Sequence, residues 1–452
     1  MGPLRPEVAT MRFKDKFELS AVLLSALVSM ISNVALAEIE YGGSVRLSDL
    51  FIKSESLVPI TGENESYLNV TDLNLRLIAE GAFTETLSAE LHAVGDLSFE
   101  STNNQNLVYA VTDTSRINRL FSGATEWNDE GGWAGQLGID RMNVRWFLPW
   151  ADITVGRQAI TLGTAYFWNP LDVFRPYDAT TFDRDYKTGV DALRLDVALS
   201  DFWSTTLIYS AGRDGSMEPG KSHSLARIYG SARGFDLTAQ VSYEHRDPSP
   251  LTTAYVGHDY DVTPIDDYYS LLQLGGGISG ELGSIPIRLE LVLLSLEQSS
   301  ANPLTLPSAG FAGSRESYLD TNSTTLVVGT GYRFSNDFSL ELEHLHSGIL
   351  DTTSLNVGYS LQSIGITRQA SPHVSAVLLN YLVHPLVQAS LATLFDWNGT
   401  SALLQANVTS SISDEIELLL SGIMPIDFES PSQPGEFDTY PTTLFVQAKG
   451  YF

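Results

Sequence analysis

The chain has 452 residues, 43% of them hydrophobic, with 26 Lys and Arg against 54 Asp and Glu and a formal net charge of −28. So negative a chain is a poor partner for nucleic acid, whose phosphates would repel it. The absence of Cys excludes disulfides, thiolate metal sites and Cys nucleophiles. Past the amino terminus no apolar run approaches the ~20 residues of a membrane helix. A soluble chain of this length would normally divide into two or three domains, and a closed barrel is the main class of fold that forms a single domain from it.

The amino terminus has the pattern of an export signal. Basic residues precede an apolar run over residues 21–31, which is followed by the small-x-small site Ala35-Leu36-Ala37. This predicts a signal peptide over residues 1–37 and a mature barrel over 38–452, with Met11 as an alternative start. A membrane anchor is disfavoured because the apolar run is short and interrupted by Ser.

The segments after the signal alternate between apolar and polar residues. In residues 68–80, Leu73, Leu75 and Leu77 have one parity, whereas Asp72, Asn74 and Arg76 have the other. Successive side chains of a strand point to opposite faces, so the leucines are expected to face lipid and the polar set the lumen of a barrel. Trp146 and Trp150 fit an interfacial aromatic girdle.

This periodicity predicts an 18-stranded antiparallel transmembrane β-barrel with short periplasmic turns and long external loops. The expected strands are 41–52, 68–80, 85–98, 137–148, 153–160, 190–199, 202–213, 222–231, 235–246, 268–280, 285–296, 324–334, 337–346, 373–382, 386–395, 401–411, 415–425 and 439–452. Residues 99–133 are expected to form an external loop. Residues 354–369 also alternate, but an even strand number favours a loop there.

Two groups of charged residues are expected to line the pore. The basic group is Arg76, Arg141, Arg145, Arg157 and Arg194, and the acidic group is Asp72, Glu90, Asp96, Asp196, Glu341, Glu343, Glu415 and Glu417. Facing strips of opposite charge would create a transverse field that orients a charged solute. The alternative is a lumen filled by Arg–carboxylate pairs.

Arg157 has the parity of the lipid-facing residues Ile153 and Val155, and a charge in lipid costs roughly 2–4 kcal/mol near the bilayer centre. We predict a bulge at Gly156 that shifts the register and turns Arg157 into the lumen. The alternative is a girdle Arg whose charged end reaches the headgroups.

Residues 161–188 form a long connection rich in aromatic side chains, with Tyr166, Phe167 and Trp168 in a row. So many aromatics would be costly to expose, so we expect the loop to fold into the barrel as a constriction rather than to cap it from outside. The expected constriction residues are Trp168, Asp172, Phe174, Arg175 and Lys187.

The motifs Gly156-Arg157-Gln158, 168–176 (Trp-Asn-Pro-Leu-Asp-Val-Phe-Arg-Pro) and 187–195 (Lys-Thr-Gly-Val-Asp-Ala-Leu-Arg-Leu) resemble the alginate-export family of outer-membrane porins and its Gly-Arg-Gln relatives. The resemblance implies passive passage of a solute through an 18-stranded barrel, and some relatives would instead sheathe a cytochrome. The last strand, ending in Phe452, also resembles that of bacterial outer-membrane proteins, whose final Phe is read by the barrel assembly machinery.

Metal and catalytic motifs are sparse. One acidic segment could hold a divalent ion that bridges lipopolysaccharide, although acidic loops are usually only solvated. Its candidate ligands are His258, Asp267 and the carboxylates of Asp259, Asp261 and Asp266. His344 and His346 share one strand face and are a candidate ligand pair. A Gly-x-Ser-x-Gly elbow is lacking, so no enzyme and no cofactor are expected.

The sequence therefore predicts a channel in the bacterial outer membrane for a charged hydrophilic solute, with an anionic saccharide as the candidate. Its expected partners are the bilayer, lipopolysaccharide and the solute. A sheath for a multihaem cytochrome, a structural or adhesive barrel, and an outer-membrane lipase are the alternatives.

Overall fold

The computed structural model describes residues 38–54, 66–102, 118–121, 123–128, 132–181, 183–213, 219–246, 269–298, 304–307, 315–318, 321–351, 355, 358, 361–362, 366–428, 435–438 and 440–452. The signal peptide predicted over residues 1–37 lies outside this part of the chain. Among the described residues, no helix has the length and apolar character to span a membrane.

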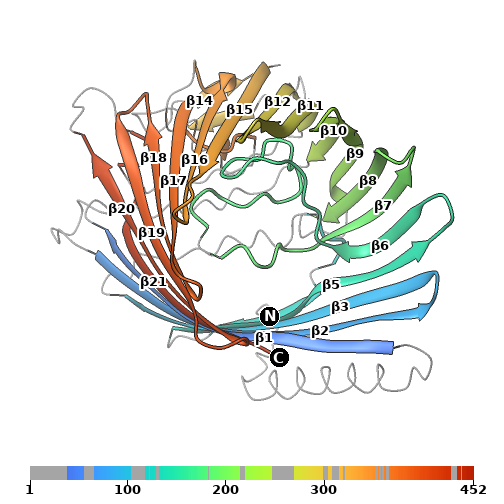
Figure 1. The fold of residues 1–452 in the computed structure, drawn as a ribbon, viewed down its shortest axis with the longest axis horizontal. Coiled ribbons are helices and arrows are strands. Elements are labelled where there is room, and N and C mark those ends of the chain that lie inside the picture. The colour runs from blue at the N-terminus through green and yellow to red at the C-terminus, as the bar shows by residue number, and fades with distance from the viewer. Residues whose placement is uncertain are drawn as a thin grey trace, which may run out of the picture.

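One antiparallel sheet contains nearly all of the strands and curls into a ring (Figure 1). Its strands are β1 (Glu38–Ser54), β2 (Ser66–Thr84), β3 (Leu87–Thr102), β4 (Ala124–Asn128), β5 (Trp133–Phe147), β6 (Asp152–Gln158), β7 (Val190–Ala198), β8 (Trp203–Arg213), β9 (Pro219–Ala232), β10 (Phe235–Arg246), β11 (Tyr269–Leu282), β12 (Ile285–Gln298), β15 (Thr321–Arg333), β16 (Phe338–Ser347), β17 (His373–His384), β18 (Val387–Asp396), β19 (Ser401–Ser411), β20 (Ile416–Asp427) and β21 (Thr442–Tyr451). β13 (Leu304–Pro307) and β14 (Arg315–Tyr318) form a separate hairpin.

The ring is closed because the last strand pairs with the first, from Ser44 opposite Tyr451 to Lys53 opposite Thr442. Phe452 extends this pairing, since its backbone exchanges hydrogen bonds of 2.9 and 3.1 Å with Gly43. In the described part of the chain the sheet has nineteen strands, and there β4 pairs only with β5, beyond the end of β6. The other eighteen strands form the closed barrel that the periodicity predicts.

The alternation also places the side chains as expected. Leu73 and Leu75 are exposed on the outside of the ring, whereas Arg76, which has the opposite parity, is buried. The last strand repeats the pattern, with Leu444 and Val446 exposed and Lys449 buried. The described strands thus have an apolar outer surface, to which the exposed Trp146 and Trp150 also contribute.

Two details of the predicted topology are settled by the strand pairing. β16 pairs directly with β17, so residues 354–369 contribute no spanning strand, and the connection begins with the 3-10 turn η2 (Gly348–Leu350). The loop expected over 99–133 is shorter than predicted, because β3 continues to Thr102 and β4 occupies 124–128.

The predicted bulge at Gly156 is wrong. β6 keeps one register with both β5 and β7 through this residue. Gly156 instead has φ of +119°, and a Cβ there would lie 2.2 Å from the carbonyl oxygen of Met142. The strand therefore contains a backbone conformation that favours glycine at this position, and no residue is inserted as a bulge would require. The nearby register shift falls in β5, where Asp140 is skipped between the partners of His92 and Ala93.

Candidate functional site

The connection between β6 and β7, residues 159–189, crosses the space that the strands enclose, as the green segment of Figure 1 shows. We call it the inner loop. Its backbone and side chains contact strands on widely separated parts of the ring, including β12, β16, β1 and β21. The inner loop therefore lies inside the barrel, and its fastening defines the candidate site.

Two carboxylates of the wall hold the first half of the inner loop. Glu343 of β16 accepts hydrogen bonds from the backbone N–H groups of Tyr166, Phe167 and Trp168 at 2.7, 2.9 and 2.8 Å. Glu290 of β12 accepts from the N–H groups of Thr164, Ala165 (3.1 Å) and Leu171 (3.3 Å). Backbone amides of the loop thus find charged acceptors on the wall, which are among the stronger hydrogen bonds in proteins.

Gly163 permits this close approach. Its φ is +88°, and a Cβ would lie 2.9 Å from Oε1 of Glu290 and 2.8 Å from Oδ1 of Asn169. A larger residue would suffer backbone strain and displace the anchoring carboxylate.

A buried ion pair closes the base of the inner loop. Lys187 Nζ binds the carboxylate of Asp172 and donates to the carbonyl oxygen of Ile160 at 2.5 Å. Both side chains are about 5% exposed. Burial raises the pKa of Asp172 and lowers that of Lys187, while the pair's mutual attraction opposes both shifts. Removing one partner would leave the other charge buried and uncompensated.

Charged residues on the first and last strands hold the second half of the loop. Arg46 of β1 pairs with Asp183 at 2.8 Å, and Lys449 of β21 pairs with Asp185 at 2.9 Å. The Tyr451 hydroxyl also donates to Asp185 at 3.0 Å. Burial alone would raise the pKa of Asp185, but the hydrogen bond and charge of Lys449 hold it below its ordinary value.

The aromatic residues of the inner loop pack against an apolar part of the inner wall. Phe167 and Trp168 lie in one buried cluster with Leu345 and Val374, which are fully buried on β16 and β17. Phe437, from the connection between β20 and β21, joins the same cluster. Phe167 and Trp168 thus cover the wall instead of meeting water, as expected, whereas Tyr166 remains exposed.

All five basic residues of the predicted strip are engaged in ion pairs. The pairs are Arg76–Asp140 (2.9 Å), Arg141–Glu90 (3.0 Å), Arg145–Asp152 (2.6 Å), Arg157–Asp191 (2.7 Å) and Arg194–Asp196 (2.7 Å). Arg141, Arg194 and Arg145 keep side-chain exposures of 19, 33 and 46%, so these three retain access to the lumen.

Arg157 is the exception to the predicted pore lining. It is 1% exposed, and besides Asp191 it donates to the carbonyl oxygens of Ile139 (2.8 Å) and Phe121 (2.5 Å). Its side chain lies near the end of β6, which pairs with β5 and β7, and is buried from both lipid and water. Its role in the structure is to satisfy the backbone of the wall.

The predicted acidic residues have different surroundings. Glu341 pairs with Arg288, Glu417 pairs with Lys449 at 3.3 Å, and Glu343 anchors the inner loop. Asp72 and Asp96 are half-buried on the inner face. Glu415 was wrongly placed in the pore: it precedes β20 and lies exposed in the turn after β19.

Four of the predicted constriction residues, Trp168, Asp172, Phe174 and Lys187, are at most 5% exposed, and Arg175 is half-buried with φ of +56°. They hold the inner loop in place. Among the described residues of the loop, the exposed ones are Thr161, Thr164, Tyr166, Asp178 and Asp185. The sequence analysis missed Glu290, although its parity opposite Leu289 and Leu291 marks it as inward. It also missed Arg46 and Lys449, whose partners are more than 130 residues away.

The two predicted metal sites have separate outcomes. The acidic residues at 258–267 lie outside the described part of the chain. His344 and His346 do share a face, but the groups close to His346 are His373 and Asp351, not a ligand atom of His344.

The closed ring of eighteen strands, its apolar exterior and its charged interior define a bacterial outer-membrane β-barrel with a porin-like fold. No family model and no curated protein matches the sequence, so the resemblance to the alginate-export family is not confirmed.

Comparison with solved structures finds the following similarities, of which the first supports the shared fold. The chain is similar to OccAB1 of Acinetobacter baumannii, with 8% identity, 92% of this chain and 96% of that chain covered, and a TM-score of 0.53. It is also similar to OmpTdeltaL8, a loop L8 deletion mutant of the Vibrio cholerae outer membrane protein OmpT (8% identity, 92% and 100% covered, TM-score 0.45). A third is OccK11 (OpdR) of Pseudomonas aeruginosa (10%, 91% and 96%, TM-score 0.48).

Proposed function

We propose that this barrel is a channel for passive diffusion of a charged hydrophilic solute and that the inner loop is its constriction. The observation that carries the proposal is the fastening of the loop to opposite walls: to Glu290 and Glu343 on one side and to Arg46 and Lys449 on the other. A loop held at both ends across the lumen narrows the path for solute, and its anchors keep it in that position.

The charges beside the loop support a charged solute. Arg141 and Arg194 are partly exposed on the inner wall, and each has a carboxylate partner that fixes its position. Fixed charges of both signs can exchange hydrogen bonds with a solute that gives up part of its hydration shell. We further propose an anionic saccharide as the solute, because its carboxylates would bind guanidinium groups and its hydroxyls the neighbouring acids. The resemblance of the Gly-Arg-Gln segment to alginate-export porins favours the same class.

The cytochrome sheath is less well supported. A sheath requires a lumen wide enough for a second protein, whereas here the inner loop and Phe437 occupy the interior beside β16 and β17. The anchors described above would have to break before such a partner could enter.

Reversal potentials in planar bilayers under a salt gradient test the proposal. The wild-type barrel should conduct and should favour the anion. The double variant Arg145→Gln/Arg194→Gln should lose that preference, because both side chains are accessible from the lumen. Arg233→Gln, at the turn between β9 and β10, is the matched control and should leave selectivity unchanged. Cation selectivity would overturn the anionic solute, and absence of conductance would overturn the channel itself.

A further inference from the structure

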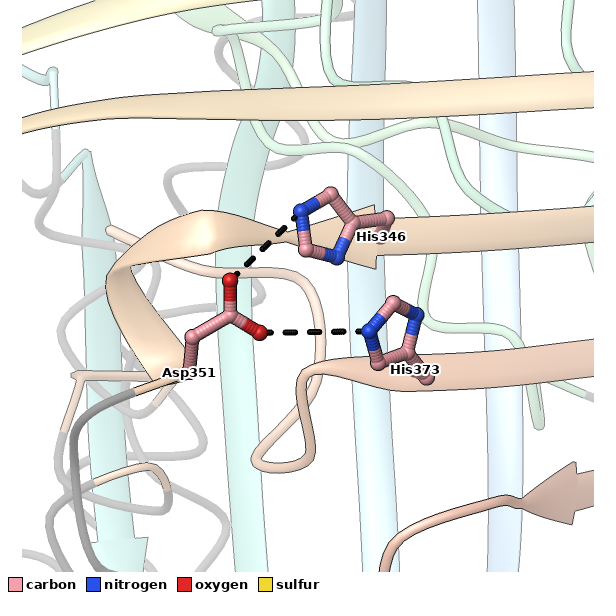
Figure 2. Close-up of side chains that lie close together, drawn as sticks. All are labelled: His346, Asp351 and His373. Carbon is pink, nitrogen blue, oxygen red and sulfur yellow. Dashed lines mark ion pairs between the residues drawn. The ribbon is translucent and has the colours of Figure 1, made fainter.

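A cluster of two histidines and one aspartate lies on the outer face of the barrel, at the end opposite the short turns. His346 at the end of β16 is paired directly across from His373 at the start of β17. Their neighbours Leu345 and Val374 are fully buried inside, so the two imidazoles belong to the outward parity. The turn η2 then brings Asp351 beside both rings, as Figure 2 shows.

The three side chains converge with their ligand atoms facing one another. Oδ2 of Asp351 is 3.7 Å from Nε2 of His346, and Oδ1 is 3.9 Å from Nε2 of His373 (Figure 2). The two rings are stacked with centroids 4.5 Å apart, and all three ligand atoms lie within 4.8 Å of one another. Ligands about 2.0–2.2 Å from a tetrahedral zinc ion are roughly 3.3 Å apart, so small side-chain rotations would complete the geometry.

The charges at this cluster favour a cation. Within the described residues, the carboxylate of Asp351 has only His346 and His373 as ion-pair partners, and no Lys or Arg neutralises it. The other group of this kind, Glu80, Glu90 and His92, differs in this respect. There Arg141 binds Glu90 at 3.0 Å and Arg76 lies 3.2 Å from His92, so cationic side chains already occupy the positions around the carboxylates.

We propose that His346, His373 and Asp351 bind a divalent transition-metal ion such as Zn²⁺. Imidazole nitrogen and carboxylate oxygen are the donors that zinc accepts, and three protein ligands leave one position open. Side-chain exposures of 28% for His346 and 42% for His373 give an ion access from outside. Trp397, 59% exposed on the same outer face, donates to Ser375 beside the cluster and marks the interfacial level at which this position opens.

Such an ion would link β16, the turn η2 and β17 where the long connection between these two strands begins and ends. The order of the site in the chain fits this role, because the two histidines are adjacent in the sheet and Asp351 belongs to the loop between them. Metal binding to the folded barrel would therefore also stabilise it against unfolding.

Titration calorimetry of the untagged full-length barrel in detergent with Zn²⁺ at pH 7.5 tests the proposal. We expect a site of one ion per chain whose affinity falls at least about tenfold in His346→Ala, in His373→Ala and in Asp351→Asn. His384→Ala, at the opposite end of β17, is the control and should bind as the wild type does. Binding should weaken at pH 5.5, because metal-ligating imidazole must be neutral.

Copper(II) in place of zinc provides a second readout that does not depend on affinity. The electron paramagnetic resonance spectrum should show coupling to two imidazole nitrogens, and to one in either histidine variant. Retained heat modifiability would show that each variant is a folded barrel. Absence of stoichiometric binding, or binding that the three ligand variants leave unchanged, would overturn the proposal.

Discussion

Replacing Glu290 and Glu343 together by Ala should release the first half of the inner loop. Each carboxylate accepts three backbone hydrogen bonds from the loop, and a hydrogen bond to a charged group contributes about 1.5–3 kcal/mol. Losing even one such contribution raises the equilibrium constant for local opening by at least about tenfold. Hydrogen exchange of the amides over 164–171 should accelerate by that factor or more.

The barrel itself should survive this change, because the strand pairing of β12 and β16 does not depend on the two side chains. Exchange in the strands should therefore stay slow. The matched control is Asp196→Ala/Glu341→Ala, which also removes two lumen carboxylates, paired with Arg194 and Arg288. Equal protection of the loop amides in the wild type and the Glu290/Glu343 variant would contradict the anchoring described here.

Glu436 should make stability fall as the pH rises towards 8. This side chain is 1% exposed and accepts hydrogen bonds from the N–H groups of Ala370 (3.1 Å) and Ser371 (2.9 Å), so it joins the β20–β21 connection to the β16–β17 connection. Burial raises its pKa from 4.5 to about 8, and the charges of Asp396 and Asp178 add to the increase. The folded state therefore holds a proton that the unfolded state has lost between these two pH values.

The sign follows from this difference. The contribution of Glu436 to the free energy of unfolding is fully present below pH 4.5. It falls by up to about 1.4 kcal/mol per pH unit between pH 4.5 and 8, and then stays constant. Urea unfolding of the wild type and of Glu436→Gln at pH 5 to 9 measures it, and the difference between the two should carry this slope. Glu415→Gln, at an exposed turn, should show none. A difference that does not change with pH would refute the assignment.

Much of the fold follows from alternation alone, because a strand with one face in lipid must repeat every second residue. The strands at 235–246 and 401–411 begin and end where the sequence predicts. Two-residue periodicity says nothing about local departures from it, however. The register shift in β5 lies at Asp140, whose carboxylate pairs with Arg76 and Arg119, and Gly156 has a positive φ without a bulge, so the bulge was sought at the wrong residue.

The candidate site was predictable only in part. A concentration of aromatic residues at 166–168 indicated a loop that must find an apolar wall, and it lies inside the barrel beside Leu345 and Val374. The partners of its charges could not be predicted. Lys449 and Asp185 are separated by 264 residues, and their pairing depends on the closure of β21 onto β1. The five arginines of the predicted strip are all paired with carboxylates, as the alternative interpretation of the sequence held.

The most direct test of whether the inner loop restricts passage is single-channel conductance in planar bilayers. The wild type is compared with a barrel in which a short flexible linker replaces residues 164–185. The excised barrel should keep its heat modifiability, because the described loop residues lie between strands that pair without them. Its conductance should rise severalfold. A folded excision variant that conducts no better than the wild type would contradict the account.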